Sequence, residues 1–158
     1  FADLGGTGFK GIIAHNNSGE SYNILFDAGI STSATDNRIG FYVKKTNGWS
    51  SVSSPAGSIN DTTKWYYLTL THSGGVLTGY VDGVSIGTIT NANSIVKSSF
   101  SAIQFGLYGT SAGSEYLNGY IDEVKISNTA RPLTWIKTEY NNQAKPSSFL
   151  YTSLENEY

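Results

Sequence analysis

The sequence predicts an all-β domain built from antiparallel strands, and three observations lead to this prediction. Of the 158 residues, 18 are Gly and 11 are Tyr, while only 14 % are charged. Short apolar runs alternate with clusters of Gly, Asn, Asp and Ser, which is typical of strands joined by tight turns. Asn47-Gly48 and Asp82-Gly83 each separate two apolar runs, and both dipeptides favour two-residue hairpin turns.

The apolar runs place the expected strands along the chain. These strands are residues 9–15, 22–26, 39–45, 49–52, 65–71, 76–81, 84–89, 100–108 and 116–126. The first two are expected to form a hairpin, and 65–71 is expected to be a central strand. A short helix is expected at 130–140, because Leu133, Ile136 and Tyr140 recur at helical spacing.

The last expected strand carries an acidic residue on an apolar side. The residues between Asn118 and Asn128 alternate, so side chains two apart share a face. One face would carry Tyr120, Asp122, Val124 and Ile126. A carboxylate on such a face is costly unless it is hydrogen-bonded, paired or bound to a metal.

Five phrases of the sequence resemble one known family, and they occur in that family's order. Residues 118–128 resemble the last strand of laminin G-like, concanavalin A-like jelly-roll domains. The other phrases are Lys64–His72, Leu77–Val84, Ile103–Gly106, and Asn128–Arg131 with Trp135-Ile136. Together they cover roughly Phe9 to Asn142. The resemblance implies an all-β, two-sheet antiparallel jelly-roll sandwich with one short C-terminal helix.

The same resemblance suggests how the chain is organised. Residues 1–142 are expected to form the jelly-roll domain, and residues 143–158 a C-terminal connector. Related domains carry further strands before the first one seen here, so N-terminal strands are expected to be missing. Either upstream residues of a longer polypeptide supply them, or a neighbouring chain does so by strand addition.

Composition argues against several kinds of partner and chemistry. The chain has no Cys, which excludes disulfides and thiolate chemistry. It has no apolar run of membrane-spanning length, so no membrane insertion is expected. The net charge is −2 and no basic patch is apparent, so nucleic acid is not an expected partner.

The domain is expected to be non-catalytic. Glucanases of the similar superfamily carry E-x-D-x-x-E on one strand, which places two carboxylates on the same face. That pattern is absent here. Asp122 and Glu123 are adjacent, so they are expected to point to opposite faces of a strand rather than to form a catalytic pair.

Asp122 is the candidate metal ligand. In similar jelly rolls this aspartate often lies near a structural Ca²⁺ bound by carboxylate and carbonyl oxygens, so the resemblance implies structural calcium as a cofactor. The alternative is that Asp122 only accepts hydrogen bonds from neighbouring backbone N–H groups.

Aromatic side chains suggest binding of a glycan or polysaccharide. Sugar rings have apolar faces that stack on Trp and Tyr. Trp49 is the leading candidate, because it follows a turn and has polar neighbours such as Asn47. Tyr42, Tyr108 and Tyr116 could join it. Trp65 is a weaker candidate, since the matching Trp of the similar family is generally in the core. The alternative is that Trp49 covers a sheet edge.

Two functions from different classes remain open. The first is a carbohydrate-binding or adhesion module of a larger extracellular or cell-surface protein, secreted by a bacterium or archaeon. The second is a structural module of a surface layer or extracellular filament, whose partners are neighbouring protein domains or subunits. In this second case, strand addition is one way to complete the fold.

Overall fold

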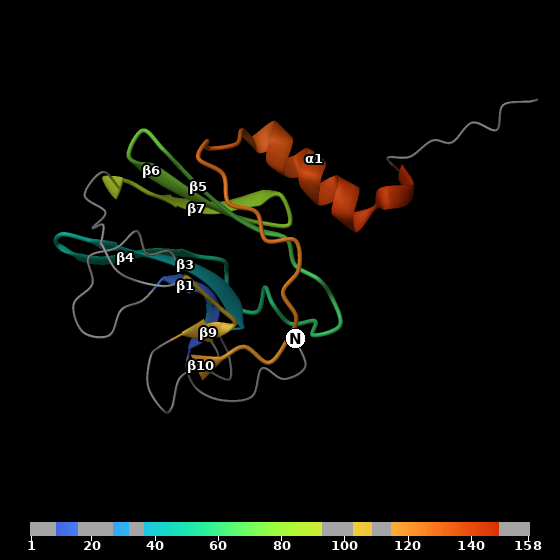
Figure 1. Ribbon diagram of the computed structural model, residues 1–158, viewed down its shortest axis with the longest axis horizontal. Coiled ribbons are helices and arrows are strands. Elements are labelled where there is room, and N and C mark those ends of the chain that lie inside the picture. Colours follow the sequence, from blue (N-terminus) through green and yellow to red (C-terminus); the bar gives the residue numbers. More distant parts are fainter. Residues whose placement is uncertain (1–8, 16–26, 32–36, 93–102, 109–114, 149–158) are drawn as a thin grey trace, which may run out of the picture.

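A computed structural model describes residues 9–15, 27–31, 37–92, 103–108 and 115–148 (Figure 1). The strands in these ranges are β1 Phe9–His15, β2 Asp27–Ser31, β3 Arg38–Lys45, β4 Gly48–Ser53, β5 Leu68–Ser73, β6 Val76–Val81, β7 Val84–Ile89, β8 Ile103–Phe105, β9 Leu107–Tyr108 and β10 Glu115–Tyr116. The helix α1 Leu133–Ala144 follows them, and a 3₁₀ turn, η2, spans Pro146–Ser148. The predicted strand at 22–26 lies outside the described residues.

The described strands form antiparallel sheets in two layers. The larger sheet has the order β4-β3-β2-β1-β8, and the smaller sheet has the order β5-β6-β7. Strands β9 and β10 form a separate two-stranded ribbon. Figure 1 shows the smaller sheet stacked over the larger one, with α1 on the outer side of the smaller sheet. This confirms the all-β, two-sheet antiparallel sandwich with one short C-terminal helix.

Tight turns fix the hairpins as the sequence predicts, with one shift. Asp82 and Gly83 have φ values of +51° and +74°, and they join β6 to β7. These values suit the twist of a two-residue hairpin turn. In the β3–β4 hairpin, however, Lys45 pairs with Gly48. The turn residues are therefore Thr46 and Asn47, and Gly48 opens β4 with a φ of +125°.

The core lies between the two sheets and is centred on β3. Ile39, Phe41 and Val43 alternate along this strand, and all three are buried. Val43 belongs to one apolar cluster with Leu77 of β6 and Ile89 of β7. The buried side of β3 therefore faces the smaller sheet, and its other side chains are left for the outer surface.

Two glycines allow the sheets to approach closely. A Cβ added to Gly79 of β6 would lie 2.6 Å from Cδ2 of Phe41. A Cβ added to Gly87 of β7 would lie 2.6 Å from Cγ2 of Val52. Real Cβ atoms do not come this close to other carbon atoms, so the hydrogen side chain is required at Gly79 and Gly87 for this packing.

Two predicted strands are shorter or more interrupted than expected. Strand β5 begins at Leu68, so residues 65–67 are not part of it. In the described sheet, β5 pairs only with β6 and is an edge strand rather than a central one. The predicted strand 100–108 is split into β8 and β9 at Gly106, which has a φ of +71°.

The predicted strand at 116–126 is the main error of the sequence-based assignment. Only Glu115 and Tyr116 form a strand there. Glu123 has a φ of +52°, which is incompatible with extended pairing, and its N–H donates to Oδ1 of Asp122 at 2.8 Å. The side chain–backbone bond thus competes with a β ladder. The face carrying Tyr120, Asp122, Val124 and Ile126 is exposed, whereas Ile121 packs against the core.

Helix α1 docks on the smaller sheet. Ile136 is fully buried, and a Cβ added to Gly83 would lie 3.3 Å from Cδ1 of Tyr140. The helix ends at Ala144, two residues after the predicted boundary between domain and connector, and that boundary stays a prediction. In the described part of the chain, no helix is both long enough and apolar enough to cross a membrane.

We predict that Gly79→Ala lowers the free energy of unfolding by about 1–3 kcal/mol, because the new methyl group overlaps the ring of Phe41. Urea denaturation measures the change. Ser85→Ala, at an exposed position on β7, is the matched control and is expected to change stability by less than about 0.5 kcal/mol. Equal stability of the two variants would contradict the close packing of the sheets.

Candidate functional site

The leading aromatic candidate lies on the outer face of the β3–β4 hairpin. Trp49 pairs across the strands with Lys44, and its side chain is 48 % exposed. The neighbouring Val52 packs against the core, so Trp49 and Ser51 point away from it. Nζ of Lys44 lies 5.4 Å from the centroid of the Trp49 ring. The lysine therefore caps one face of the indole through a cation–π contact.

Two more predicted residues lie beside Trp49. Tyr42 pairs with Ser51 and is on the same side of β3 as Lys44, so it is a diagonal neighbour of Trp49. Its ring lies over Gly40 and is half-buried. Asn47 is exposed in the turn. The structure thus gathers these three residues around Lys44 in what we call the hairpin site: Tyr42, Asn47 and Trp49.

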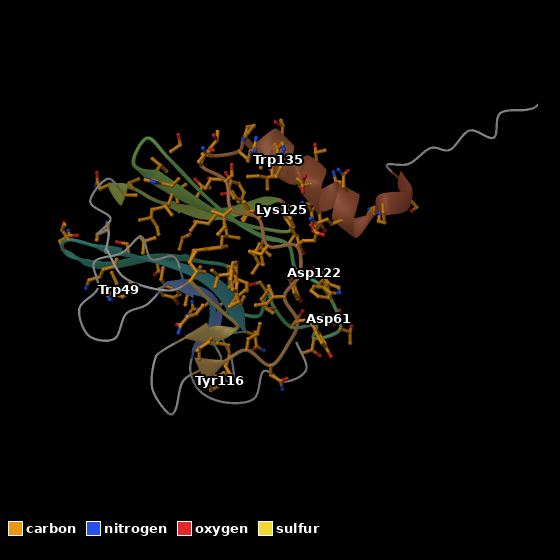
Figure 2. All side chains as sticks on the ribbon, in the orientation of Figure 1. Trp49, Asp61, Tyr116, Asp122, Lys125 and Trp135 are labelled. Atoms are coloured by element: carbon orange, nitrogen blue, oxygen red, sulfur yellow. The ribbon has the colours of Figure 1, made fainter. Side chains whose placement is uncertain are left out.

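The other two predicted tyrosines lie elsewhere. Tyr108 pairs with Glu115 in the β9–β10 ribbon, and Tyr116 on the facing strand is exposed. Strand β4 forms one edge of the larger sheet, and β1, which contacts the ribbon, is three strands away. Figure 2 shows Trp49 and Tyr116 at different corners of the molecule. Tyr108 and Tyr116 therefore cannot complete the hairpin site.

The described contacts of Asp122 include a hydrogen bond to the backbone. Its Oδ1 accepts the N–H of Glu123, which is the capping role considered as the alternative. Among the described residues, no group of three or more His, Cys, Asp or Glu side chains gathers where a metal could be held. Calcium usually takes six to eight oxygen ligands. A structural calcium at Asp122 therefore needs further oxygen ligands and stays a prediction.

Two neighbouring carboxylates are held by a lysine. Nζ of Lys125 lies 3.0 Å from Glu139 of α1 and 3.3 Å from Glu123. The hydrogen bonds to Glu139 and then to Glu123 raise the pKa of Lys125. This triad links α1 to residues 118–128 at the surface, where ion pairs contribute little stability.

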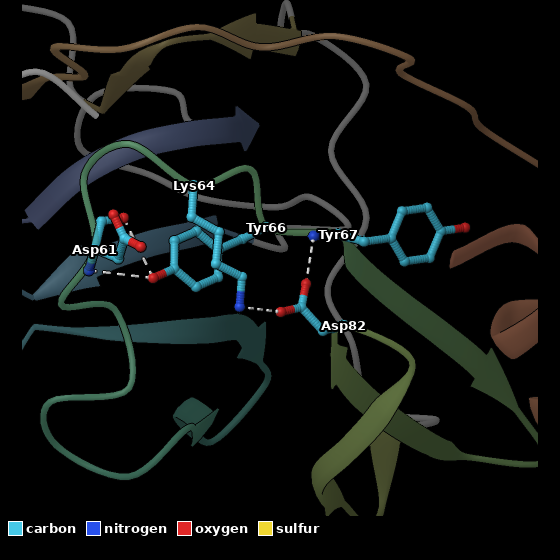
Figure 3. A network of polar contacts seen from close by, with 5 residues as sticks. All are labelled: Asp61, Lys64, Tyr66, Tyr67 and Asp82. Carbon is cyan, nitrogen blue, oxygen red and sulfur yellow. Dashed lines mark hydrogen bonds and ion pairs between the residues drawn. The ribbon is translucent and has the colours of Figure 1, made fainter. Parts of the chain in front are cut away.

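A polar network that the sequence did not reveal holds the loop before β5 (Figure 3). Oδ1 of Asp82 accepts the N–H of Tyr67 at 2.9 Å, and its Oδ2 lies 2.9 Å from Nζ of Lys64. The same Nζ is 4.6 Å from the centroid of the Tyr66 ring. The hydrogen bond to Asp82 raises the pKa of Lys64. Residues 64–67 are thus anchored to the β6–β7 turn.

Asp61 closes the other end of this loop. Its Oδ1 accepts from the backbone N–H of Thr63 at 2.9 Å and from the Thr63 hydroxyl at 2.6 Å. These two hydrogen bonds, the hydroxyl first, lower the pKa of Asp61 below its ordinary value of 3.8. The signal in the sequence was Asp61-x-Thr63, a spacing that favours a side chain–backbone turn.

Trp65 is presented by this anchored loop and is 63 % exposed. The sequence prediction placed it in a strand, with a core Trp as the family pattern. The structure corrects both points. Strand β5 begins only at Leu68 because the N–H of Tyr67 donates to Oδ1 of Asp82 rather than to a strand partner. Trp65 therefore joins Trp49 as an exposed aromatic.

A family match agrees with this architecture. Residues 5–146 match the Laminin_G_3 family, described as the concanavalin A-like lectin/glucanases superfamily. No curated protein matches the chain. A similar solved structure is that of an S-layer domain-containing protein (residues 221–444) from Clostridium thermocellum, with 24 % identity and a TM-score of 0.37. The match covers 89 % of this chain and 66 % of that chain, slightly under two thirds of it.

We predict that Thr63→Val raises the pKa of the Asp61 carboxyl toward its ordinary value, because the hydroxyl donor is lost while the backbone donor remains. Carboxyl chemical shifts followed by NMR between pH 2 and 6 measure the change. Thr63→Ser keeps the hydroxyl and is the control. Because folding lowers this pKa, the stabilisation from Asp61 is present above the unfolded pKa and is lost as pH falls through the folded pKa. An unchanged pKa in Thr63→Val would contradict the hydrogen bond.

Proposed function

The chain belongs to the Laminin_G_3 family of concanavalin A-like lectin/glucanases, and from this premise we propose that it is a carbohydrate-binding or adhesion module without catalytic activity. The proposal places it in a larger extracellular or cell-surface protein of a bacterium or archaeon. The composition, rich in Gly and Tyr and with only 14 % charged residues, supports a role in binding uncharged polar ligands. Fold alone does not fix function, so the proposal depends on a site.

The exposure of Trp49 in the hairpin site is the observation that carries the proposal. An indole on a rigid two-stranded hairpin provides a flat apolar surface for the C–H face of a sugar ring. Asn47 in the turn and Lys44 across the strand supply hydrogen-bond donors for sugar hydroxyls. One face of the ring is capped by Lys44, so a sugar would stack on the other face or displace the lysine.

A structural Ca²⁺ with Asp122 as one ligand remains part of the proposal to be tested. It would need further oxygen ligands beside this carboxylate. The binding assay therefore has one arm with Ca²⁺ and one with a chelator. Binding that is equal in the two arms would remove calcium from the proposal without affecting the hairpin site.

We predict that Trp49→Ala weakens binding to a polysaccharide at least about tenfold, since truncating a central aromatic anchor typically costs more than about 1.4 kcal/mol. A glycan array and sedimentation with insoluble polysaccharides identify the ligand, and titration gives the affinity. Trp49→Phe keeps a flat ring and is expected to retain more binding. The wild-type domain failing to bind any glycan would overturn the proposal.

A second candidate function is a structural module that binds neighbouring protein, and one observation favours it. Residues 118–128 expose Tyr120 at 81 % and Ile126 at 70 %. Among the described residues, this segment makes no backbone–backbone hydrogen bond outside itself. Exposed apolar side chains, beside backbone groups that have no partner among the described residues, suit the addition of an extended strand from another domain or subunit.

If this second function holds, the wild-type domain should self-associate with rising concentration. Ile126→Asn should then raise the dissociation constant at least about tenfold, because a polar amide replaces a central apolar contact. Light scattering coupled to size exclusion measures the association. Ser127→Asn, at the exposed neighbouring position, is the control. A wild-type protein that stays monomeric, and variants that do not differ from it, would count against association through this segment.

A further inference from the structure

Trp65 differs from the other two tryptophans in what covers its ring. Lys44 lies over the ring of Trp49, and Cζ of Arg131 lies 5.1 Å from the centroid of the Trp135 ring. Trp65 has no cation–π or ring contact with another described residue. It is also the most exposed of the three. Its large apolar surface is therefore available to a ligand.

Trp65 lies on the outer side of the smaller sheet. Tyr66 and Leu68 pack against the core, and side chains alternate in an extended chain, so Trp65 and Tyr67 point the other way. Figure 3 shows the rings of Tyr66 and Tyr67 pointing in opposite directions. The ring centroid of Tyr67 is 6.2 Å from that of Tyr140 on α1. Tyr67 thus packs beside Tyr140 where α1 docks on the sheet, and Trp65 precedes Tyr67 by two residues on the same side. We call these three residues, Trp65, Tyr67 and Tyr140, the aromatic strip.

The backbone that presents the strip is already ordered. Tyr67 donates its N–H to Oδ1 of Asp82, and its carbonyl accepts the N–H of Asp82 at 2.8 Å. Lys64, on the other side of Trp65, is held by Oδ2 of the same aspartate. A loop fixed on both sides of its aromatic residue loses little conformational freedom when a ligand binds. The strip is thus preorganised.

We propose that the aromatic strip is a second saccharide-binding site, whose ligand is a segment of an uncharged polysaccharide. This inference rests on the proposed carbohydrate-binding function. The strip is exposed at Trp65, and Lys64 and Asp82 lie beside it. An exposed indole next to polar groups suits the C–H faces and hydroxyls of sugar rings. Two of the lysines near the strip already pair with carboxylates, Lys64 with Asp82 and Lys125 with Glu139. This pairing favours an uncharged ligand over an acidic one, although Lys137 of α1 is exposed nearby.

The strip and the hairpin site are separate. Trp49 lies on the outer face of β4 in the larger sheet, whereas Trp65 precedes β5 of the smaller sheet, in the other layer of the sandwich. One sugar ring cannot contact both tryptophans. A long polysaccharide can engage both sites and gain avidity, whereas a short oligosaccharide occupies one site at a time.

The experiment measures binding of the wild-type chain and three variants to regenerated cellulose, xylan and laminarin, with alginate as the acidic comparator. The variants are Trp65→Ala, Trp65→Phe and Trp49→Ala. Trp65→Ala is expected to bind the neutral polymer that the wild type prefers at least tenfold more weakly, and Trp65→Phe less weakly than that. Circular dichroism checks the fold. In a Trp49→Phe, Trp135→Phe chain, Trp65 is the remaining tryptophan, and its fluorescence should change as a short oligosaccharide of that polymer is added.

Each other outcome has a distinct meaning. If Trp65→Ala binds as the wild type does and the Trp65 fluorescence does not change, the strip is not a saccharide site. If Trp49→Ala loses binding in the same experiment, the proposed carbohydrate-binding function is still supported. A folded wild-type chain that binds none of the polymers would overturn the carbohydrate function and the strip together. Preference for alginate would overturn the assignment of an uncharged ligand. Loss of self-association in Trp65→Ala without loss of sugar binding would make the strip a protein contact instead.

Discussion

The close approach of the two sheets at Gly79 and Gly87 is the constraint on which the rest of the structure depends. Phe41 and Val52 of the larger sheet fill the space that side chains would otherwise occupy on the smaller sheet. Because the inner faces of β3 and β4 are committed to this contact, their alternate residues must lie outside. The position of Trp49 on the surface is therefore a consequence of core packing.

Much of the fold could be predicted from local sequence, because hairpins and alternating strands are encoded by neighbouring residues. The Asp82-Gly83 turn and the strand at 39–45 followed directly from such patterns. The errors arise where distant groups compete for the backbone. Asp82 takes the N–H of Tyr67 across 15 residues, and this contact sets the start of β5. No window of sequence around Trp65 contains that information.

In the candidate sites, too, features set by neighbouring residues could be predicted and features set by distant contacts could not. The hairpin site could be predicted because Asn47 and Trp49 are near neighbours in sequence and Tyr42 lies on the adjoining strand. Tyr108 and Tyr116 were grouped with them only by residue type, and the order of strands separates them. The aromatic strip needs Tyr140 from a helix that docks on the far side of the smaller sheet, so only the tertiary structure brings it together.

The docking of α1 also determines which part of the domain yields first when the chain is pulled. A pull applied along the chain through α1 would load the exposed pair of Lys125 and Glu139, the contact of Tyr140 with the β6–β7 turn and the buried side chain of Ile136. Exposed ion pairs are weak compared with a ladder of strand hydrogen bonds around a buried core. The helix would therefore detach and lengthen the chain before the sandwich unfolds. Strands β3 and β4, the second of which carries Trp49, would stay paired under tension.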